Sequence, residues 1–344
     1  MFIALVFVLL VVAIVTKVIN YKPLTYISIL IVTPFLMFNR GNNDYLVYAE
    51  MFYHPENSPE PGYSFLLQII QLCGGTSHEQ VLLILGIFFA FTLYRFTKYT
   101  KSMNLILFLY VLFPFILDLT QVRDTFMLLF MLNAILEYYN KSKLRCYVLL
   151  VIGCTFHYFG IFYIISFLML DFFKKKNSYI IIALVSLANL VLMPFMLKLG
   201  ISVIPIQSIA SRLIIYSTGS MRISTLLVWG SILLVDLIVL KFFIRHLDSS
   251  ERDKNKELIK ILYDLMYSGI IFFGCVLYLF ESTRFFRNLF IIKYLLVGFM
   301  LPNMNRDEKI LIILYLVITS SLFAYAYSLG LDYDYALLSN ALFN

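Results

Sequence analysis

The chain has 344 residues, of which 61% are hydrophobic and 14% are charged, and its mean hydropathy is +0.88. This composition excludes a soluble globular domain and is typical of a membrane protein with several spans. The formal net charge of +7 is therefore interpreted through membrane topology, and nucleic acid is excluded as a partner of so apolar a chain. The four cysteines form no C-x-x-C pair, which indicates neither a disulfide framework nor a zinc site.

Apolar segments follow one another along the whole chain. They cover about 2–16, 24–38, 80–96, 104–117, 123–139, 146–156, 159–173, 179–197, 223–243, 259–280, 287–301 and 310–329. Several are shorter than the roughly 20 residues that a straight span requires, which predicts short or re-entrant helices. We predict an all-α fold: a single transmembrane domain over 1–344, built as a polytopic helical bundle of about 11–12 transmembrane segments.

The longest polar connection is the outer loop 39–79. It begins Asn-Arg-Gly-Asn-Asn-Asp-Tyr and continues as a short aromatic helix to about Tyr53. Three prolines then break the chain, and the turn Glu-Pro-Gly-Tyr at 60–63 starts an apolar helix over 63–72. That helix is too short to span, so we predict that it lies at the membrane interface or packs over the bundle.

A polar septet, Asp-Leu-Thr-Gln-Val-Arg-Asp at 118–124, lies between two apolar segments with no long loop on either side. A charge inside the membrane costs roughly 2.5–3.5 kcal/mol. Arg123 and Asp124 offset part of that cost for each other, and we expect Asp124 to orient Arg123. A polar tip between two membrane helices is by default a candidate functional site.

Basic clusters flank the segment 146–173 on both sides, at 141–145 and 174–176. Both ends of this segment are therefore expected on one side of the membrane. About 28 residues, rising 1.5 Å each, are too few for two full spans, which predicts a dipping hairpin of two short helices. Its apex at 155–158 carries His157. The alternative for His157 is a buried histidine that bonds a backbone carbonyl.

Two further outer connections carry arginine. The loop 198–222 contains Arg212, and the tight tip 281–288 reads Glu-Ser-Thr-Arg-Phe-Phe-Arg-Asn. Within that tip Arg284 and Arg287 are three residues apart, so they are expected to share a helix face.

Lysine and arginine are distributed unevenly. With the N-terminus outside, the inside connections hold 19 of the 27 basic residues, and 14 of those 19 are lysine, as the positive-inside rule predicts. Of the remaining eight, six are arginine: Arg40, Arg123, Arg212, Arg222, Arg284 and Arg287. A guanidinium presents a rigid fork of donors that fits phosphate or carboxylate. The alternative is structural ion pairing with Asp44, Glu60, Asp124 or Glu281.

Familiar catalytic motifs are missing from the sequence: it has no Walker loop, no G-x-G-x-x-G and no H-E-x-x-H. Asp332 and Asp334 form a D-x-D, but nucleotide sugars are absent on the outer side, so a metal role there is disfavoured. Asp236 lies well within an apolar segment and is expected to be paired or to lie near Lys241 rather than to act in catalysis.

The outer polar groups define the candidate site. They are Arg40, Asp44, Glu60, Arg123, Asp124, His157, Arg212, Glu281, Arg284 and Arg287. Several arginines beside a bilayer suit a lipid-linked diphosphate, because they bind it and stabilise the charge that develops on a phosphate leaving group. A nearby carboxylate or histidine can take a proton from an attacking hydroxyl. Glycosyl transfer from such a donor needs no metal and no soluble cofactor, since the leaving group is already activated.

Four short motifs resemble the Wzy-like, EpsG-type polysaccharide polymerases. They are Asp-Tyr-x-x-Tyr at 44–48, Glu-Pro-Gly-Tyr at 60–63, Gln-Val-Arg-Asp at 121–124 and Phe-His-Tyr at 156–158. The resemblance implies a helical, membrane-embedded (GT-C-like) glycosyltransferase of the bacterial inner membrane, with its active site facing the periplasm. It also implies that the enzyme joins undecaprenyl-diphosphate-linked oligosaccharide repeat units into O-antigen of lipopolysaccharide, capsule or exopolysaccharide. Functional residues carry over from the family at Arg123, Asp124 and His157.

We therefore hypothesise a metal-independent, inverting transferase with a lipid-linked donor and a lipid-linked acceptor. Arg123, Arg212, Arg284 and Arg287 are expected to hold the donor diphosphate, with Arg40, Glu60 and Glu281 as further binding candidates. His157, or Asp44 as the second choice, is expected to activate the acceptor hydroxyl. A chain-length regulator protein is a further candidate partner.

Two alternatives stay open. A ligase that moves finished polymer to another acceptor would use the same arginines, although such enzymes usually have a larger outer loop. A transporter of the lipid-linked unit, which is not an enzyme, would need a charged path that continues into the inner half of the membrane.

Overall fold

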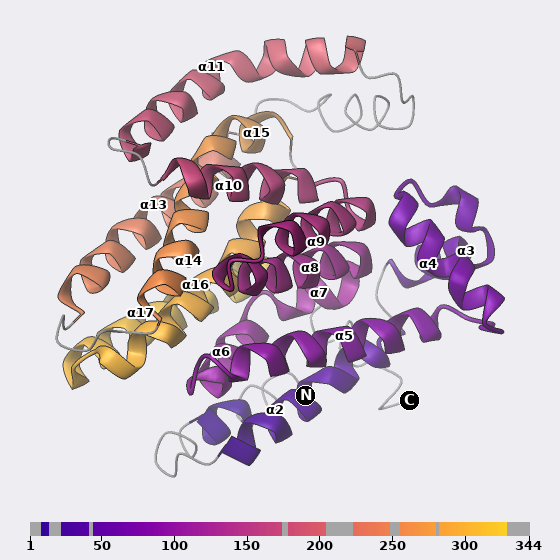
Figure 1. Ribbon diagram of the computed structural model, residues 1–344, viewed down its shortest axis with the longest axis horizontal. Helices are drawn as coiled ribbons and strands as arrows, with labels where there is room; N and C mark the ends of the chain where they lie inside the picture. The colour runs from indigo at the N-terminus through magenta and orange to yellow at the C-terminus, as the bar shows by residue number, and fades with distance from the viewer. Residues whose placement is uncertain are drawn as a thin grey trace.

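The computed structural model describes residues 8–13, 22–40, 44–173, 178–203, 223–247, 255–279 and 282–328. Throughout these ranges the regular structure is helical (Figure 1). The helices are α2 (Lys22–Met37), α3 (Tyr45–Tyr53), α4 (Pro61–Leu72), α5 (Glu79–Thr97), α6 (Met103–Leu112), α7 (Phe115–Thr120), α8 (Val122–Tyr139), α9 (Lys143–Phe156), α10 (Gly160–Phe172), α11 (Ser178–Val203), α13 (Ile223–His246), α14 (Lys256–Ser268), α15 (Phe273–Tyr278), α16 (Thr283–Met300) and α17 (Arg306–Ser328). The predicted all-α class is confirmed.

Among the described residues, six helical stretches are long and apolar enough to cross a membrane. They cover Glu79–Thr97, Ser178–Phe195, Ile223–His246, Lys256–Tyr278, Thr283–Asn303 and Arg306–Tyr327. Three further apolar helices, at Pro23–Met37, Met103–Leu112 and Gly160–Phe172, are shorter than the roughly 20 residues of a straight span. The three short apolar helices lie in the first half of the chain and five of the six long ones in the second half, as expected for a polytopic membrane protein that contains incomplete spans.

The predicted segments and the observed helices differ in several places; the segment predicted over 259–280, for example, is α14, a short 3-10 helix and α15. The segment predicted over 104–117 is two helices, α6 and α7, because Pro114 between them has no N–H to donate and its ring obstructs the preceding turn. The tip predicted over 281–288 is largely the first two turns of α16. Arg284 and Arg287 therefore project from a helix that is anchored in the bundle.

The hairpin predicted over 146–173 is present as α9 and α10. Lys143 at the start of α9 and Asp171 near the end of α10 form an ion pair with an N–O distance of 2.6 Å, so the two open ends of the hairpin lie together. At its turn, a Cβ added to Gly160 would lie 2.7 Å from the Cα of Cys154. The two helices can approach this closely only because glycine has no side chain.

The central helix of the bundle is α16. Of its apolar stretch 94% is buried, compared with 22% for α11 and 33% for each of α13 and α17. α16 packs against α6, α13 and α14, whereas α11 runs along one edge of the molecule (Figure 1). Polar side chains on α16 are therefore presented to neighbouring helices, while α11, α13 and α17 present apolar side chains outward.

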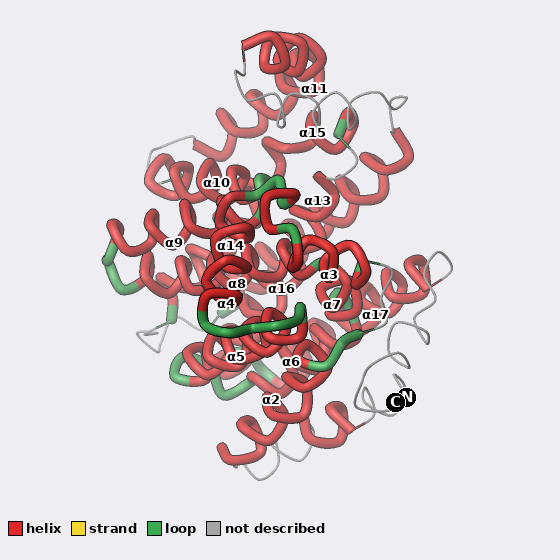
Figure 2. Tube along the Cα trace, turned by 90° about the vertical axis from the view of Figure 1, so that its right-hand side faces the viewer, coloured by secondary structure: helices red, strands yellow, loops and turns green. Residues whose placement is uncertain are grey.

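The connections between helices gather at two opposite ends of the bundle. At one end, which we call the site end, the Tyr158 hydroxyl at the hairpin turn donates to the carbonyl of Pro59 in the loop 39–79. α3 and α4 cover this end, on the right in Figure 1, and Figure 2 looks directly onto it. At the opposite, far end, Lys141 pairs with Glu257. Among the described residues, each of these two contacts thus joins connections that are predicted to share one side of the membrane.

A buried ion pair joins α13 to α16 in the middle of the bundle. Lys293 Nζ lies 3.1 and 3.0 Å from the two carboxylate oxygens of Asp236, and the Tyr315 hydroxyl donates to the same carboxylate at 2.6 Å. Asp236 is paired, as predicted, but its partner is Lys293 and not Lys241. Five residues along a helix turn a side chain by about 140° from its starting direction, so Lys241 points away from the face that packs on α16.

Replacing Lys293 with methionine is expected to lower the free energy of unfolding by about 3–5 kcal/mol, because it leaves the buried Asp236 carboxylate unpaired. The double variant Lys293→Met/Asp236→Leu is expected to recover most of that loss, since no lone charge remains in the bundle. Thermal unfolding of the purified protein in detergent, together with the amount of protein in the membrane, measures both. Equal destabilisation in the single and double variants would contradict the prediction.

Candidate active site

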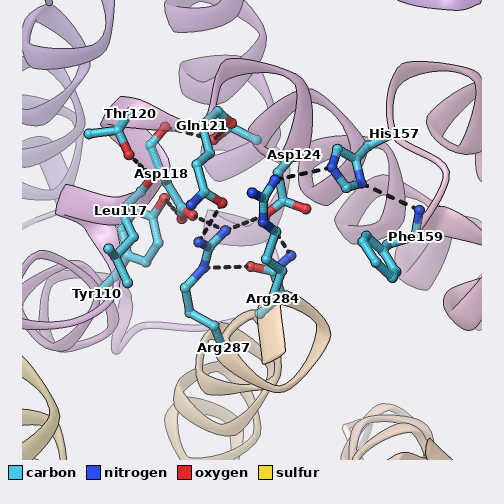
Figure 3. A network of polar contacts seen from close by, with 12 residues as sticks. Tyr110, Leu117, Asp118, Thr120, Gln121, Asp124, His157, Phe159, Arg284 and Arg287 are labelled. Carbon is cyan, nitrogen blue, oxygen red and sulfur yellow. Dashed lines mark hydrogen bonds and ion pairs between the residues drawn. The ribbon is translucent and has the colours of Figure 1, made fainter. Parts of the chain in front are cut away.

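Arg287 is the centre of a buried polar network at the break between α7 and α8 (Figure 3). Its Nη2 lies 3.2 Å from Asp118 Oδ1 and also pairs with Asp124, while Nη1 donates to Gln121 Oε1 at 2.7 Å. Its Nε donates to the side-chain oxygen of Asn288 at 3.4 Å. The arginine side chain is only 3% exposed. A buried charge of this kind is stable only when it is paired, so the network fixes the start of α16 to α7 and α8.

The expectation that Asp124 orients Arg123 is wrong. Asp124 pairs with Arg287, and its Oδ2 also accepts a hydrogen bond from Asn288 Nδ2 at 3.2 Å. Consecutive residues on a helix do not face each other. Asp124 therefore points into the bundle towards α16, while Arg123 points towards the loop 39–79.

Arg123 connects α8 to the outer loop. Its Nη1 pairs with Glu60, the residue that precedes α4, and its guanidinium lies 5.6 Å from the centre of the Tyr48 ring on α3. Both partners are buried. The structural alternative considered for the arginines, pairing with a nearby acid, is thus the observed state of Arg123. Arg123 Nε is a buried donor without a hydrogen-bond partner among the described residues.

His157 lies in the turn between α9 and α10 and contacts Arg284. The distance from Arg284 Nη1 to His157 Nε2 is 3.2 Å, and the backbone N–H of Phe159 is 3.4 Å from Nδ1 (Figure 3). Arginine and a backbone N–H can only donate, and a neutral imidazole has one acceptor nitrogen, so only one of these two contacts can be a hydrogen bond. The shorter contact assigns the acceptor to Nε2 and the proton to Nδ1. Burial is the main cause that lowers the pKa of His157 to about 3, with the nearby Arg284 also lowering it.

A second buried histidine, His78, packs against α3. Its ring stacks on Tyr48 with centroids 5.6 Å apart and an interplanar angle of 13°, and neither ring nitrogen has a hydrogen-bond partner among the described residues. It is 2% exposed. Burial lowers the pKa of His78 to about 4, against a smaller opposing effect of Glu79. The ring is therefore a neutral aromatic support for Tyr48, on which Arg123 rests.

Replacing His78 with phenylalanine is expected to reduce the acid sensitivity of the fold. Between about pH 4 and 6.5 the unfolded chain binds a proton at His78 that the folded chain does not, so stability is lost as pH falls through this window. At pH 5 the loss is about 2 kcal/mol. Thermal unfolding at pH 7.5 and pH 5 measures it: wild type should lose about that much more than His78→Phe. Equal losses in both proteins would contradict the assignment.

The other predicted site residues lie apart from this network or outside the described residues. Arg40 is at the rim, where its Nε lies 3.5 Å from Glu79 and its side chain is 53% exposed. Asp44 is exposed and directly precedes α3. Arg212 and Glu281 lie outside the described residues, as do Arg222, Asp332, Asp334 and the part 204–222 of the loop predicted over 198–222.

Sequence reasoning missed several groups that complete the site. Tyr110 donates to Asp118 Oδ2 at 2.6 Å, and Asn288 and Gln121 orient the Asp124–Arg287 pair. Tyr48 supports Arg123. A polar residue within an apolar run is the sequence signal that indicates such groups. Asn288 directly follows Arg287 in an apolar segment, and Gln121 belongs to the septet.

Among the described residues, no group of three or more His, Cys, Asp or Glu side chains is arranged to hold a metal ion. The groups at the site end are instead guanidiniums, carboxylates and the neutral imidazoles of His157 and His78. Such a set can bind an anion, stabilise a departing phosphate and accept a proton. The fold and the site together define a polytopic helical membrane protein with an arginine-rich polar site at one end of its bundle.

The family is shown by sequence comparison. The model of the EpsG family matches residues 19–338, nearly the whole chain, so this protein belongs to the EpsG family, a family of Wzy-like polysaccharide polymerases. Comparisons with curated proteins and with solved structures found no match. The resemblance noted from the four short motifs is therefore confirmed and extends through the second half of the chain.

Proposed function

We propose that this protein polymerises undecaprenyl-diphosphate-linked oligosaccharide repeat units by glycosyl transfer at the site end of its bundle. The observation that carries the proposal is the contact between Arg284 and His157, in a chain of the EpsG family. It places a half-buried cation beside a neutral proton acceptor. A diphosphate leaving group and an attacking hydroxyl require these two functions side by side.

In the proposed reaction the bond between the anomeric carbon of the donor and its diphosphate oxygen breaks. A bond forms between that carbon and the acceptor hydroxyl oxygen, and the hydroxyl proton passes to a base. Attack on the face opposite the leaving group inverts the anomeric configuration. The diphosphate leaves with its electron pair on oxygen, where positive charge stabilises it.

The donor diphosphate is assigned to Arg284 first. Arg284 is half-buried and lies beside the buried network (Figure 3). Its guanidinium can therefore contact a ligand while the backbone of α16 stays in place. Arg123 is the second assignment, because its Nε is a buried donor without a partner among the described residues. Arg287 is proposed to act indirectly. Its donors bond Gln121, Asp124 and Asn288, so it holds the residues of the site in position. Arg40 and Arg212 are further candidates for the outer part of the substrate.

His157 is proposed as the base, with Asp44 as the second choice. In the structure Nε2 of His157 is engaged by Arg284. When Arg284 turns to a diphosphate, Nε2 becomes available to the acceptor hydroxyl. The low pKa of His157 keeps the imidazole unprotonated and ready to accept, and the proton is transferred late, as the leaving group departs.

The proposed location is the bacterial cytoplasmic membrane, with the site end facing the outside. The support is the uneven distribution of charge: among the described residues, Lys98, Lys101, Lys141 and Lys143 lie at or beside connections of the far end, which the positive-inside rule assigns to the cytoplasm. Lipid-linked donor and acceptor then meet in the outer leaflet. A chain-length regulator remains a proposed partner.

The test is reconstitution in liposomes with purified undecaprenyl-diphosphate-linked repeat units confined to the outer leaflet. A ladder of products that each grow by one repeat unit supports the polymerase. Transfer only to an unrelated acceptor indicates a ligase, and movement of intact units across the bilayer without a new glycosidic bond indicates a transporter. Either of the last two results overturns the proposal.

A further inference from the structure

A groove of about 710 Å³ lies on the membrane-facing side of the bundle, away from the site end. It is formed by α11, α13 and α14 together with the turn that leads into α15, the region at the upper left of Figure 1. Its volume lies in the range of small-molecule and lipid sites in proteins. Nothing in the proposed polymerisation uses it.

One face of α13 forms a continuous wall of this groove. The lining residues on α13 are Leu234, Leu237, Ile238, Lys241, Phe242, Arg245 and His246. Their spacing of three and four residues places them on one stripe of the helix. Along that stripe the side chains are apolar first and then basic at the far end. The apolar and basic side chains of this wall are therefore separated along the helix axis, and not on opposite faces of the helix.

The opposite wall is apolar and open. On α11 the lining residues are Ala183, Ser186, Leu187 and Leu190, and Leu187 is 62% exposed. Ile238 on α13 is 70% exposed. Exposed aliphatic side chains in the spans of a membrane protein meet acyl chains. Any occupant of the groove is therefore apolar over most of its length.

The basic end of the groove is held in place by aromatic rings. Lys241 Nζ lies 5.0 Å from the ring centre of Tyr263 and 5.6 Å from that of Tyr179. Among the described residues, neither Lys241 nor Arg245 forms an ion pair with a carboxylate. The positive-inside rule and the helix dipole account for basic residues at this end of α13. Neither accounts for two cations that line a groove whose remaining wall is mostly apolar.

We propose that this groove binds an anionic glycerophospholipid of the surrounding bilayer. Its acyl chains would lie between α11 and α13, and its phosphate would contact Lys241 and Arg245. Basic pockets between helices at the cytoplasmic surface are suited to anionic headgroups. A polyprenyl diphosphate is the less suitable occupant, because the arginines assigned to that ligand lie at the opposite end of the bundle. The proposal therefore stands independently of the proposed polymerase activity.

The test is native mass spectrometry of the full-length protein, purified and delipidated, with added dioleoyl phosphatidylglycerol or dioleoyl phosphatidylcholine. Wild type is expected to retain one phosphatidylglycerol in preference to phosphatidylcholine. The variant Lys241→Gln/Arg245→Gln is expected to bind phosphatidylglycerol roughly 30-fold more weakly, from the loss of two charges near the headgroup. The charge-preserving variant Lys241→Arg/Arg245→Lys should bind like wild type.

The matched control is Arg306→Gln/Lys309→Gln, which removes two charges from the same end of the bundle at the start of α17. It should leave phosphatidylglycerol binding unchanged. A second variant, Ala183→Phe, fills the apolar part of the groove without changing charge and should also weaken binding. Equal affinity of the wild type for the two lipids overturns the proposal. So does equal loss in the control, or displacement of the lipid by inorganic phosphate alone.

Discussion

Replacing Arg284 with alanine is expected to abolish long polymer while the protein still accumulates in the membrane. Arg284 is half-buried at the start of α16, so its removal leaves no cavity in the core. Loss of one group that stabilises a developing anion costs about 2.7–4 kcal/mol of the activation barrier, which is a rate loss of roughly 10²–10³. Polymer length on gels, normalised to the amount of protein in the membrane, measures the effect.

Two variants make this result specific. Arg284→Lys keeps the charge but loses the fork of donors, and we expect it to retain partial activity. Arg145→Ala removes an exposed cation at the start of α9, at the far end, and should leave polymer length unchanged. Wild-type chain length in Arg284→Ala would remove Arg284 from the diphosphate site and with it the main support for the proposed mechanism.

The positions of the membrane helices could be predicted closely from the sequence, because an apolar run between polar connections records burial in lipid directly. The hairpin of α9 and α10 could be predicted for a related reason: basic clusters on both sides of 146–173 allowed only a chain that returns to its starting side. The break at Pro114 is also a local property of the chain. Both flanking segments are apolar, so hydropathy alone does not reveal this break.

The pairing of charges could not be predicted. Which carboxylate an arginine reaches depends on the rotation of each helix about its axis, and that is set by packing between segments far apart in the sequence. Glu60 and Arg123 are 63 residues apart, and nothing local distinguishes this pair from Arg123 with Asp124. Arg284 and Arg287 looked equivalent in the sequence, yet one contacts His157 and the other is buried between two carboxylates.

This difference between the two arginines leads to the second large effect. Replacing Arg287 with alanine is expected to prevent the protein from accumulating, in contrast to Arg284→Ala. Asp118 and Asp124, both almost completely buried, would lose their shared cation. Removing one partner of a buried ion pair costs about 3–5 kcal/mol, which is a large part of the stability of an ordinary protein.

Two further variants separate the structural from the catalytic consequence of Arg287. Arg287→Ala/Asp124→Asn removes one of the stranded charges and should restore part of the accumulation while polymer remains absent, because the network that positions α16 is incomplete. Arg287→Lys keeps the charge, so the protein should accumulate, but its single ammonium cannot bond Asp118, Gln121 and Asp124 in the fixed directions of a guanidinium. We expect shortened chains from this variant. Normal accumulation and an unchanged unfolding temperature of Arg287→Ala would show that the two carboxylates do not depend on this cation, and Arg287 would then be available to bind substrate directly.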